Sequence, residues 1–412
     1  MHNQSRLLIL PANPIEMYSR KGIMEWYIPY VNPGKTFSAV YAAYVSNMNA
    51  TTTFEGISVT AIKATFFLLD YFRLLLSCLS LCITENISVI RAYCGEMPGL
   101  IACITGKLLG IPVVVSVHGH IDIYMKERGF SFIARALVYI VHSFVYSLSD
   151  YIWCVGEGLA DSVASHGISH RKITIIYNKV DTNRFANAKS WRHETRKKYG
   201  IKDEEVVLIH VGRLSSDKRI DRIINALPLL DERNIPFRFV IVGPDPGKRL
   251  KGVASLGQSR YEPTSENLRI LVKKSGIENH VLFMGRLSRE HLVRAIGMSD
   301  IYVSASTGEG FGIAIAEAQA ASLPIIATRE LMTRNHGLLV NPRTSLFYGA
   351  DNTTELANAI MLLAQNKEIY ERLSRGSVEE SSKYAWSRIE QLEANCYRAV
   401  IGLLTKQSDF DL

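Results

Sequence analysis

Short apolar runs rich in β-branched residues alternate along this chain with longer amphipathic stretches. This alternation predicts parallel β-sheets that are covered by helices. In the first half, the apolar runs predict strands at residues 6–10, 88–92, 112–117, 151–155 and 172–177. Helices are predicted between them, including 98–109 and 130–148, where Pro98 suits a first helical turn and Gly110 suits a helix end.

The pattern changes after Tyr177. Residues 178–200 are polar and rich in Lys and Arg, which predicts a hinge between two domains. The alternation then restarts, with strands predicted at residues 206–211, 237–242, 281–284, 301–304, 324–327 and 338–340. Closing helices are predicted at 352–365 and 386–404, and an exposed loop at 244–265. Because ligands of open α/β sheets bind at the carboxyl ends of the strands, the chemistry is expected in the turns that follow them.

Composition agrees with a globular protein of two to three domains, since the chain has 412 residues, of which 47% are hydrophobic and 21% charged. The net charge of +8 favours anionic partners. No signal peptide or transmembrane helix is predicted: the most apolar stretches, 65–84 and 136–149, contain Asp70, Arg73 and His142 and are interpreted as buried or interfacial helices.

The six cysteines form no C-x-x-C pair and lie in apolar surroundings, which favours a reduced cytoplasmic protein over a disulfide framework. No metal-ligand spacing is present, so neither a metal site nor a cofactor is predicted. The sequence also lacks the Gly-x-Gly-x-x-Gly and P-loop patterns, which argues against a nicotinamide enzyme or an NTPase.

The clearest candidate for anion binding follows the strand predicted at 206–211. Gly212 ends that strand, and Arg213 and Lys218 follow in the turn before a helix predicted to begin near Asp217. Two cations beside free backbone N–H groups favour a diphosphate. The alternative interpretation is a solvated arginine and lysine on an ordinary loop.

A glycine-rich turn follows the strand predicted at 301–304, and a helix is predicted to start near Phe311. Glu309 lies in the turn, and Glu317 lies about two turns into an otherwise apolar helix. A carboxylate that accepts two hydroxyl hydrogen bonds suits the ribose of a nucleotide. The alternative is that Glu317 is a salt-bridged core residue, since a buried carboxylate needs partners.

Two weaker candidates lie in the first half. The apolar run 113–117 ends in His118-Gly119, the pattern of a central parallel strand that delivers a side chain to a crevice, although a structural histidine fits as well. Gly22, after Arg20 and Lys21, would let a loop approach a diphosphate closely.

Taken in their order along the chain, several segments of this sequence resemble those of the retaining glycosyltransferases of family 4, which have the GT-B fold. The resemblance is carried by 111–119, 150–155, 172–181, 212–218, 281–285, 384–404 and, most specifically, the E-x7-E spacing of 309–317. Residues 178–181 read Asn-Lys-Val-Asp where the family commonly has Asn-Gly-Val-Asp. Only residues 329–336 stand where the family has a longer glycine-bearing loop with a glutamate, for which Glu330 is the nearest counterpart.

The resemblance implies an α/β fold of the GT-B type, with two Rossmann-like doubly wound domains facing a cleft. The acceptor-binding domain would span 1–190 and the nucleotide-sugar-binding domain 191–380, with a terminal helix, 381–412, that crosses back to the first domain. It also implies the catalytic residues His118, Arg213, Lys218 and Glu309. The implied donor-binding residues are Gly22, Gly212, Arg286, Gly310, Phe311, Gly312 and Glu317.

The function expected from the resemblance is metal-independent transfer of a hexosyl or N-acetylhexosaminyl group from a nucleotide diphosphate sugar. The acceptor would be a glycan or lipid-linked hydroxyl in cell-surface polysaccharide synthesis, and the enzyme would be cytoplasmic or peripheral at the inner face of an anionic membrane. A nucleotide-sugar epimerase and a non-catalytic nucleotide-sugar-binding subunit are the alternatives. Nucleic acid is not an expected partner, because the charges form no aromatic-laced stripe.

Overall fold

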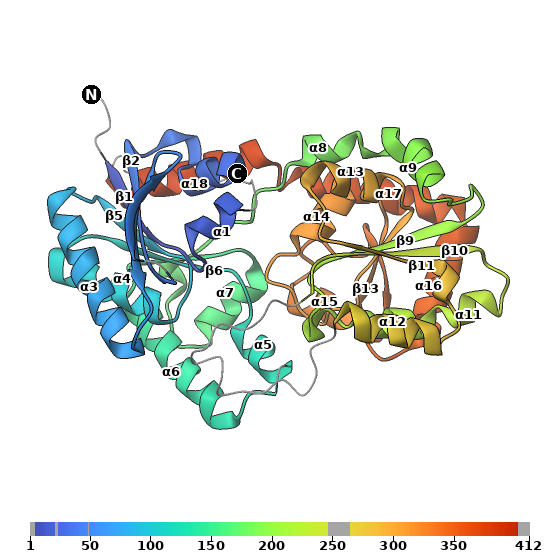
Figure 1. Ribbon diagram of the computed structural model, residues 1–412, viewed down its shortest axis with the longest axis horizontal. Helices are drawn as coiled ribbons and strands as arrows, with labels where there is room; N and C mark the ends of the chain where they lie inside the picture. The colour runs from blue at the N-terminus through green and yellow to red at the C-terminus, as the bar shows by residue number, and fades with distance from the viewer. Residues whose placement is uncertain (1–4, 21–23, 48, 128, 246–263, 403–412) are drawn as a thin grey trace. The chain divides into compact units, whose positions relative to one another are not determined.

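The structure, a computed structural model, describes residues 5–20, 24–47, 49–127, 129–245 and 264–402, and these fall into two compact units. Unit 1 takes its residues from Met1–Gly119, Phe132–Lys179 and Ser387–Leu412, and unit 2 from His120–Ser131 and Val180–Trp386. Each unit is a central sheet covered by helices (Figure 1), as the alternating pattern predicts. The chain leaves unit 1 after Lys179 and returns at Ser387, so these boundaries differ from the expected ranges 1–190, 191–380 and 381–412.

Unit 1 contains an eight-stranded sheet of order β3-β4-β2-β1-β5-β6-β7-β8. Its strands are β1 (Arg6–Leu10), β2 (Ala39–Ser46), β3 (Ala50–Phe54), β4 (Ile57–Lys63), β5 (Val89–Ala92), β6 (Val113–Val117), β7 (Tyr151–Cys154) and β8 (Ile173–Ile175). All neighbouring pairs are parallel except β3 and β4. The five strands predicted in this half are confirmed, whereas β2, β3 and β4 were missed.

Helices cover both faces of the sheet of unit 1 (Figure 1). One face carries α1 (Ile15–Arg20), α2 (Met24–Val31) and α18 (Trp386–Val400), whose buried side chains join those of the strands in one hydrophobic core. The other face carries α3 (Phe67–Thr84), α4 (Met97–Leu109), α6 (Phe132–Leu148) and α7 (Glu157–Ala164). Short 3₁₀ helices are found at Pro33–Lys35 and His170–Lys172.

Unit 2 contains a six-stranded sheet of order β11-β10-β9-β12-β13-β14, in which every neighbouring pair is parallel. Its strands are β9 (Val206–Val211), β10 (Phe237–Val242), β11 (Val281–Gly285), β12 (Ile301–Val303), β13 (Ile325–Thr328) and β14 (Ser345–Tyr348). Five of them lie where the sequence predicted strands. Since all six run in one direction, their carboxyl ends share one edge of the sheet.

Two layers of helices enclose the sheet of unit 2 (Figure 1). One layer has α10 (Ile220–Ala226), α11 (Pro228–Asp231), α12 (Ser265–Lys274), α15 (Arg329–Arg334) and α16 (Thr353–Gln365). The other has α8 (Thr182–Ala186), α9 (Arg192–Lys198), α13 (Arg289–Gly297), α14 (Ile313–Ala320) and α17 (Lys367–Ser382). α5 (Ile121–Glu127) and the 3₁₀ helices Ala188–Trp191, Ser216–Lys218 and Glu278–His280 complete the unit.

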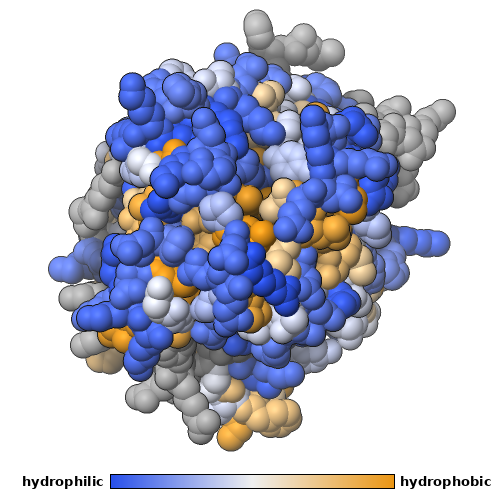
Figure 2. All heavy atoms as spheres, turned by 90° about the vertical axis from the view of Figure 1, so that its right-hand side faces the viewer, coloured by the Kyte–Doolittle hydropathy of each residue, from blue (hydrophilic) through white to orange (hydrophobic). Residues whose placement is uncertain are grey.

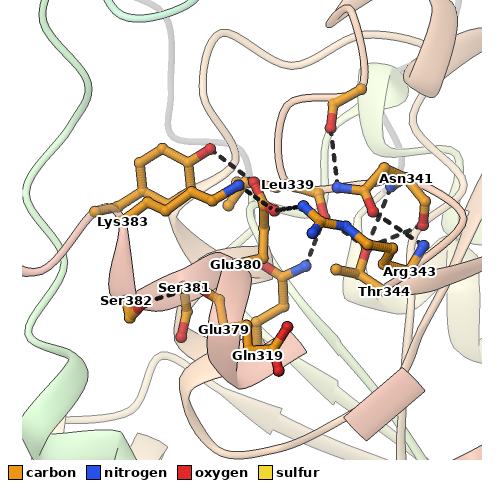
Figure 3. Close-up of polar contacts among 12 residues, drawn as sticks. Gln319, Leu339, Asn341, Arg343, Thr344, Glu379, Glu380, Ser381, Ser382 and Lys383 are labelled. Carbon is orange, nitrogen blue, oxygen red and sulfur yellow. Dashed lines mark hydrogen bonds and ion pairs between the residues drawn. The ribbon is translucent and has the colours of Figure 1, made fainter. Parts of the chain in front are cut away.

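The strand predicted at 338–340 is wrong, and the sixth strand of the sheet is β14 instead. The apolar run is buried, but Leu339 has a φ of 64°, which a strand does not allow. The Leu339 carbonyl accepts hydrogen bonds from Gln319 Nε2 at 2.6 Å and Thr344 Oγ1 at 2.8 Å (Figure 3). The segment is therefore a buried turn that side chains of α14 and of the turn itself hold in place.

The polar segment predicted as a hinge, 178–200, is mostly helical and belongs to unit 2 from Val180 onward. Arg192 and Arg196 both pair with Asp300, at 2.7 and 2.6 Å, just before β12 begins. Arg196 is 2% exposed and also donates to the carbonyl of Met298. These two basic residues of the predicted hinge thus fix α9 to the body of unit 2.

Candidate active site

The turn after β9 places Gly212, Arg213 and Lys218 at the carboxyl edge of the sheet of unit 2. Gly212 N donates to Val242 O at 2.9 Å, so the turn is fixed to the end of β10. Lys218 lies in a 3₁₀ turn, Ser216–Lys218, and α10 begins only at Ile220, after the predicted start near Asp217. Arg219, with a φ of 46°, separates the two helical segments.

Gly243, the residue after β10, is expected to tolerate no side chain. A Cβ atom there would lie 1.7 Å from Gly212 O, at a φ of 152°. We expect Gly243→Ala to lower the free energy of unfolding of unit 2 by about 1–3 kcal/mol and to displace the Gly212 turn. Gly276→Ala is the control, because Gly276 also has a positive φ, of 70°, but has open space around it. Denaturant unfolding measures both variants, and equal destabilisation would contradict the steric account.

Lys218 and Glu309, which are 91 residues apart, meet at this edge. The ammonium Nζ donates to Glu309 Oε1 at 2.5 Å and Oε2 at 2.7 Å, and Asp217 Oδ2 is 3.8 Å away. The two side chains are 15% and 17% exposed, so the pair is largely shielded from solvent. The structure thus brings together two of the residues predicted as catalytic.

The loop that carries Glu309 is held by Asn335, which sequence analysis missed. Asn335 donates from Nδ2 to Glu309 O at 3.0 Å and accepts from Glu309 N at 3.4 Å. Gly312 has a φ of 97° and precedes α14, while Phe311 is buried with its ring edge-on against Tyr384. The helix starts at Ile313, after the predicted start near Phe311. The loop therefore has a fixed backbone in which glycines leave room for a ligand.

Glu317 is buried in α14, and its carboxylate pairs with Arg289 of α13. Burial raises the pKa of the Glu317 carboxyl, and the Arg289 guanidinium opposes that rise. This pair is what the alternative interpretation of Glu317 predicted. Arg289 itself was not predicted, although a buried carboxylate signals the need for a charged or hydrogen-bonding partner. Arg289 is 32% exposed, so the pair is open to solvent from the arginine side.

Arg213 and Arg286 are the exposed cations of the site. Arg213 follows β9 and Arg286 follows β11, at the same edge of the sheet. Within the described ranges neither guanidinium makes a hydrogen bond or an ion pair. Both are therefore available to an anion, whereas Lys218 must share its charge with Glu309.

His210, in β9, lies beneath the Gly212 turn and was not predicted. Its Nδ1 lies 3.0 Å from Val303 O, and a Cβ at Gly212 would come within 3.2 Å of its Nε2. Burial lowers the pKa of His210 to about 4; the bond to Val303 opposes this, and the Lys218 charge adds to it. The imidazole is therefore neutral at pH 7, which avoids a further charge beside Lys218.

This histidine predicts how the stability depends on pH. The unfolded imidazole takes up a proton near pH 6.5, but the folded one does so only near pH 4, so stability is lost as the pH falls between these values. The expected loss from His210 between pH 7 and pH 5 is about 2 kcal/mol. His210→Asn keeps a donor for Val303 and removes the titration. Thermal unfolding at both pH values should show a smaller loss in the variant, and an unchanged loss would contradict the account.

His118 lies in unit 1, at the end of β6, and not in the unit that holds the other described site residues. Its ring stacks on Tyr93, and its buried Nε2 has no hydrogen-bond partner in the described part of the chain. Burial, helped by the Arg91 charge, lowers the pKa of His118 to about 4. At pH 7 the imidazole is therefore neutral, so it can make a hydrogen bond to a ligand but carries no charge beside it.

His118 lines a small cavity of unit 1 together with Arg91, Lys179 and Glu393. Glu393 of α18 pairs with Lys179 at 2.5 Å and with Arg91, and all three side chains are buried. Lys179 stands where the resembled family commonly has glycine, and its ammonium also donates to Tyr30 O at 3.1 Å. This ionic cluster ties α18 to the last residue of unit 1 before the chain enters unit 2.

Gly22 and Lys21, which were predicted near a diphosphate, lie outside the described residues. Among residues 5–20, 24–47, 49–127, 129–245 and 264–402, no group of three or more His, Cys, Asp or Glu side chains is placed to hold a metal ion.

Two family models match the chain in the order of its two units. Residues 53–184 match the model described as glycosyltransferase family 4, and residues 192–379 match the model described as glycosyl transferases group 1. The chain is a family 4 glycosyltransferase. The predicted family and fold class are thereby confirmed.

Known relatives of this glycosyltransferase are distant in sequence and similar in fold. A sulfoquinovosyl transferase of Arabidopsis thaliana is 22% identical over 68% of this chain and 50% of its own length. An N-acetyl-alpha-D-glucosaminyl L-malate synthase of Bacillus anthracis is 22% identical over 75% of this chain and 73% of its own. The structure of Anabaena HepE in complex with UDP and glucose has a TM-score of 0.72 at 17% identity, covering 96% of this chain and all of that one. The aligned part spans only half of the first relative.

In this glycosyltransferase the short segment 329–336 forms a helix. Thr328 caps α15, and Arg334 donates to the carbonyl and the hydroxyl of Thr307 at 3.0 and 3.1 Å. Glu330 accepts from Ala350 N at 3.5 Å, beyond the end of β14, and makes no contact with the Glu309 loop that the structure records. The short segment therefore supports the loop from one side through Arg334 and Asn335.

Proposed function

We propose that this glycosyltransferase moves a sugar from a nucleotide diphosphate sugar to a glycan or lipid-linked hydroxyl, with retention of anomeric configuration. The observation that carries the proposal is the gathering of cations and carboxylates at one sheet edge: Lys218 with Glu309, Glu317 with Arg289, and the exposed Arg213 and Arg286. A diphosphate requires cations, and ribose hydroxyls require a carboxylate. The complexes of Anabaena HepE with UDP and with UDP-glucose support the same class of donor here.

In the proposed reaction, the acceptor oxygen bonds to the anomeric carbon while the bond from that carbon to the diphosphate breaks. The acceptor proton passes to the departing phosphate oxygen, so atoms and charge balance. Arg213 and Lys218 stabilise the leaving diphosphate, which is the principal catalytic contribution. Lys218 turns from Glu309 toward the phosphate oxygens, and Glu309 is freed to accept a hydrogen bond from a sugar hydroxyl.

The remaining roles are those that the resemblance to family 4 implies. Glu317 accepts hydrogen bonds from the ribose hydroxyls, and Arg286 contacts the base. The backbone of Gly310, Phe311 and Gly312, with Gly212 and Gly22, gives the donor close access, and neutral His118 donates a hydrogen bond to the sugar near the reacting carbon. No metal or cofactor takes part, because the cations of the chain neutralise the diphosphate.

The transferred group is proposed to be hexosyl or N-acetylhexosaminyl, in cell-surface polysaccharide synthesis. The proposed location is the cytoplasm, including the inner face of an anionic membrane where a lipid-linked acceptor would reside.

A panel of nucleotide sugars, incubated with and without a cell lipid extract, tests the proposal. We expect nucleoside diphosphate to be released only when an acceptor is present. The product should keep the donor's anomeric configuration, and EDTA should not change the rate. Isomerised donor without release would identify an epimerase. Donor binding without turnover on any acceptor would identify a non-catalytic subunit and contradict transfer.

A further inference from the structure

Unit 1 carries an unusual amount of exposed apolar surface on one side. Fourteen of the nineteen large apolar side chains that are exposed among the described residues lie on α3, α4 and α6 or just before α3. They are Phe66, Phe67, Leu68, Leu69, Phe72, Leu76, Ile83, Leu108, Phe132, Ile133, Leu137, Tyr139, Ile140 and Phe144. We call this set the α3–α6 face. An exposed apolar patch of this size marks an interaction surface.

The exposed residues are spaced as helical stripes. On α6 the stripe is Ile133, Leu137, Ile140 and Phe144, with spacings of four, three and four residues. On α3 an exposed stripe, Leu69, Phe72 and Leu76, lies opposite the buried Leu74, Cys78 and Cys82. Both helices are thus apolar on two sides, although only one side of each is buried in unit 1. A helix of this kind needs an apolar environment on its outer side as well.

The stripes lie on helices that belong to one layer. α3 packs against α4, and α4 packs against α6, so the three helices form one layer on the same side of unit 1 (Figure 1). The face of unit 2 that carries α11 and α16, on the right in Figure 1, is by contrast mostly hydrophilic, with apolar residues in smaller patches (Figure 2). Only five of the nineteen exposed large apolar side chains among the described residues belong to unit 2, so the apolar surface is a local feature of unit 1.

The exposed charged side chains of these three helices are all cationic. Arg73 and Lys107 are exposed and Arg135 is partly exposed, while the one acidic residue of the three helices, Asp70, is buried and accepts hydrogen bonds from Thr65. Lys107 pairs with Asp150 at 2.7 Å and is still half exposed. Apolar side chains flanked by Lys and Arg match a bilayer surface that contains anionic lipids.

α3 also has the length and composition of a membrane-crossing helix, and only 22% of its residues are buried in the structure. It packs against α4, β2 and β4 and is anchored by the Asp70–Thr65 hydrogen bonds. Leaving the sheet to cross a bilayer would break these contacts, so the helix lies along the surface. A second copy of the chain fits less well, because a two-fold contact would bring two sets of these cations into one interface to which α3, α4 and α6 contribute no exposed acidic residue.

We propose that the α3–α6 face binds the surface of a phospholipid bilayer containing anionic lipids. The apolar side chains enter the boundary between headgroups and acyl chains, and Arg73, Lys107 and Arg135 contact the headgroups. This contact would place unit 1 where a lipid-linked acceptor is found, but it does not depend on the proposed reaction.

Sedimentation of the full chain with vesicles, without donor or acceptor, tests this proposal. One vesicle type contains phosphatidylcholine alone, and the other contains equal parts of phosphatidylcholine and phosphatidylglycerol. We expect binding to the anionic vesicles that weakens with salt and is weaker on the neutral ones. The double variant Leu68→Gln/Ile133→Gln should bind at least about 100-fold less, because each such side chain contributes about tenfold or more to partitioning.

Leu68 and Ile133 are 78% and 72% exposed, so their replacement leaves the core of unit 1 intact, which circular dichroism verifies. The matched control is Ile270→Gln/Leu362→Gln, two exposed apolar residues of unit 2, which should bind as the parent does. The proposal is overturned if the parent binds neither vesicle type, or if the α3–α6 variant binds like the control. A stable dimer that the α3–α6 variant dissociates, seen by light scattering, would overturn it in favour of self-association. The α3–α6 variant should still transfer sugar to a water-soluble acceptor. This activity is measured without vesicles, so a failure of membrane binding is distinguished from a failure of the proposed reaction.

Discussion

Lys218→Met is expected to lower kcat for sugar transfer about 30- to 1000-fold, which corresponds to about 2–4 kcal/mol of lost transition-state stabilisation. The ammonium is the partly shielded cation beside the Gly212 turn, and its charge is most valuable when the diphosphate leaves. Methionine keeps the length of the side chain, so packing around Glu309 is largely preserved. The measurement is the rate of nucleoside diphosphate release at saturating donor.

Lys202→Met is the control for this change. Lys202 lies in the same unit, and its side chain is 75% exposed, so its removal should leave kcat within about twofold of the parent. Both variants should give the circular dichroism spectrum of the parent. Full activity of Lys218→Met would remove the lysine from the proposed mechanism.

Replacement of Glu317 with alanine should weaken donor binding about 10- to 100-fold, because hydrogen bonds to a charged group contribute about 1.5–3 kcal/mol each. The effect should appear in the KM for the donor and in the Kd for the free nucleoside diphosphate. Glu290→Gln is the matched control, since this neighbour of Arg289 is 71% exposed and pairs with Arg294. Unchanged affinity for the nucleotide in Glu317→Ala would show that this carboxylate is only a core residue paired with Arg289.

The Arg289–Glu317 pair adds a pH dependence to this prediction. Burial raises the pKa of Glu317, and Arg289 holds that rise in check, so Arg289→Ala should raise the pKa further. Donor binding requires the ionised carboxylate. As the pH is lowered, Arg289→Ala should therefore lose donor affinity at a higher pH than the parent does. Arg289→Lys should restore most of the parent profile. Identical pH profiles for all three proteins would contradict the coupling.

Sequence patterns predicted strands best where both faces of a strand are buried. Residues 206–211 and 237–242 are continuous apolar runs, and β9 and β10 have those bounds. Residues 338–340 are equally apolar, but their burial comes from packing in a turn that Gln319 and Thr344 hold. Apolar pattern alone does not separate these cases, because it reports burial and not backbone conformation.

The strands that were missed lie at one end of the sheet of unit 1. β3 and β4 form a hairpin whose two-residue turn, Glu55-Gly56, has φ values of 44° and 90°. This turn needs positive φ at both positions, and glutamate is not the residue that usually signals it. β3 itself, with the sequence Ala-Thr-Thr-Thr-Phe, is largely exposed and shows no clear apolar alternation.

For the candidate site, the sequence predicted which turns carry chemistry but not which side chains meet. Lys218 and Glu309 come from loops that only the strand order β9-β12 makes neighbours. The buried carboxylate of Glu317 called for a cation, but several arginines were available in the sequence before the structure identified Arg289. Nothing in the sequence marked His210 as part of the site, because its role depends on lying beneath the Gly212 turn in the folded chain.

A crystal structure of the chain with a bound nucleoside diphosphate tests the central claim most directly. The account predicts the diphosphate within hydrogen-bond distance of the Gly212 turn, Arg213 and Lys218, with the Lys218–Glu309 contact opened and the ribose hydroxyls on Glu317. A nucleotide bound elsewhere in unit 2 or on unit 1, with both ion pairs of the site undisturbed, would contradict it.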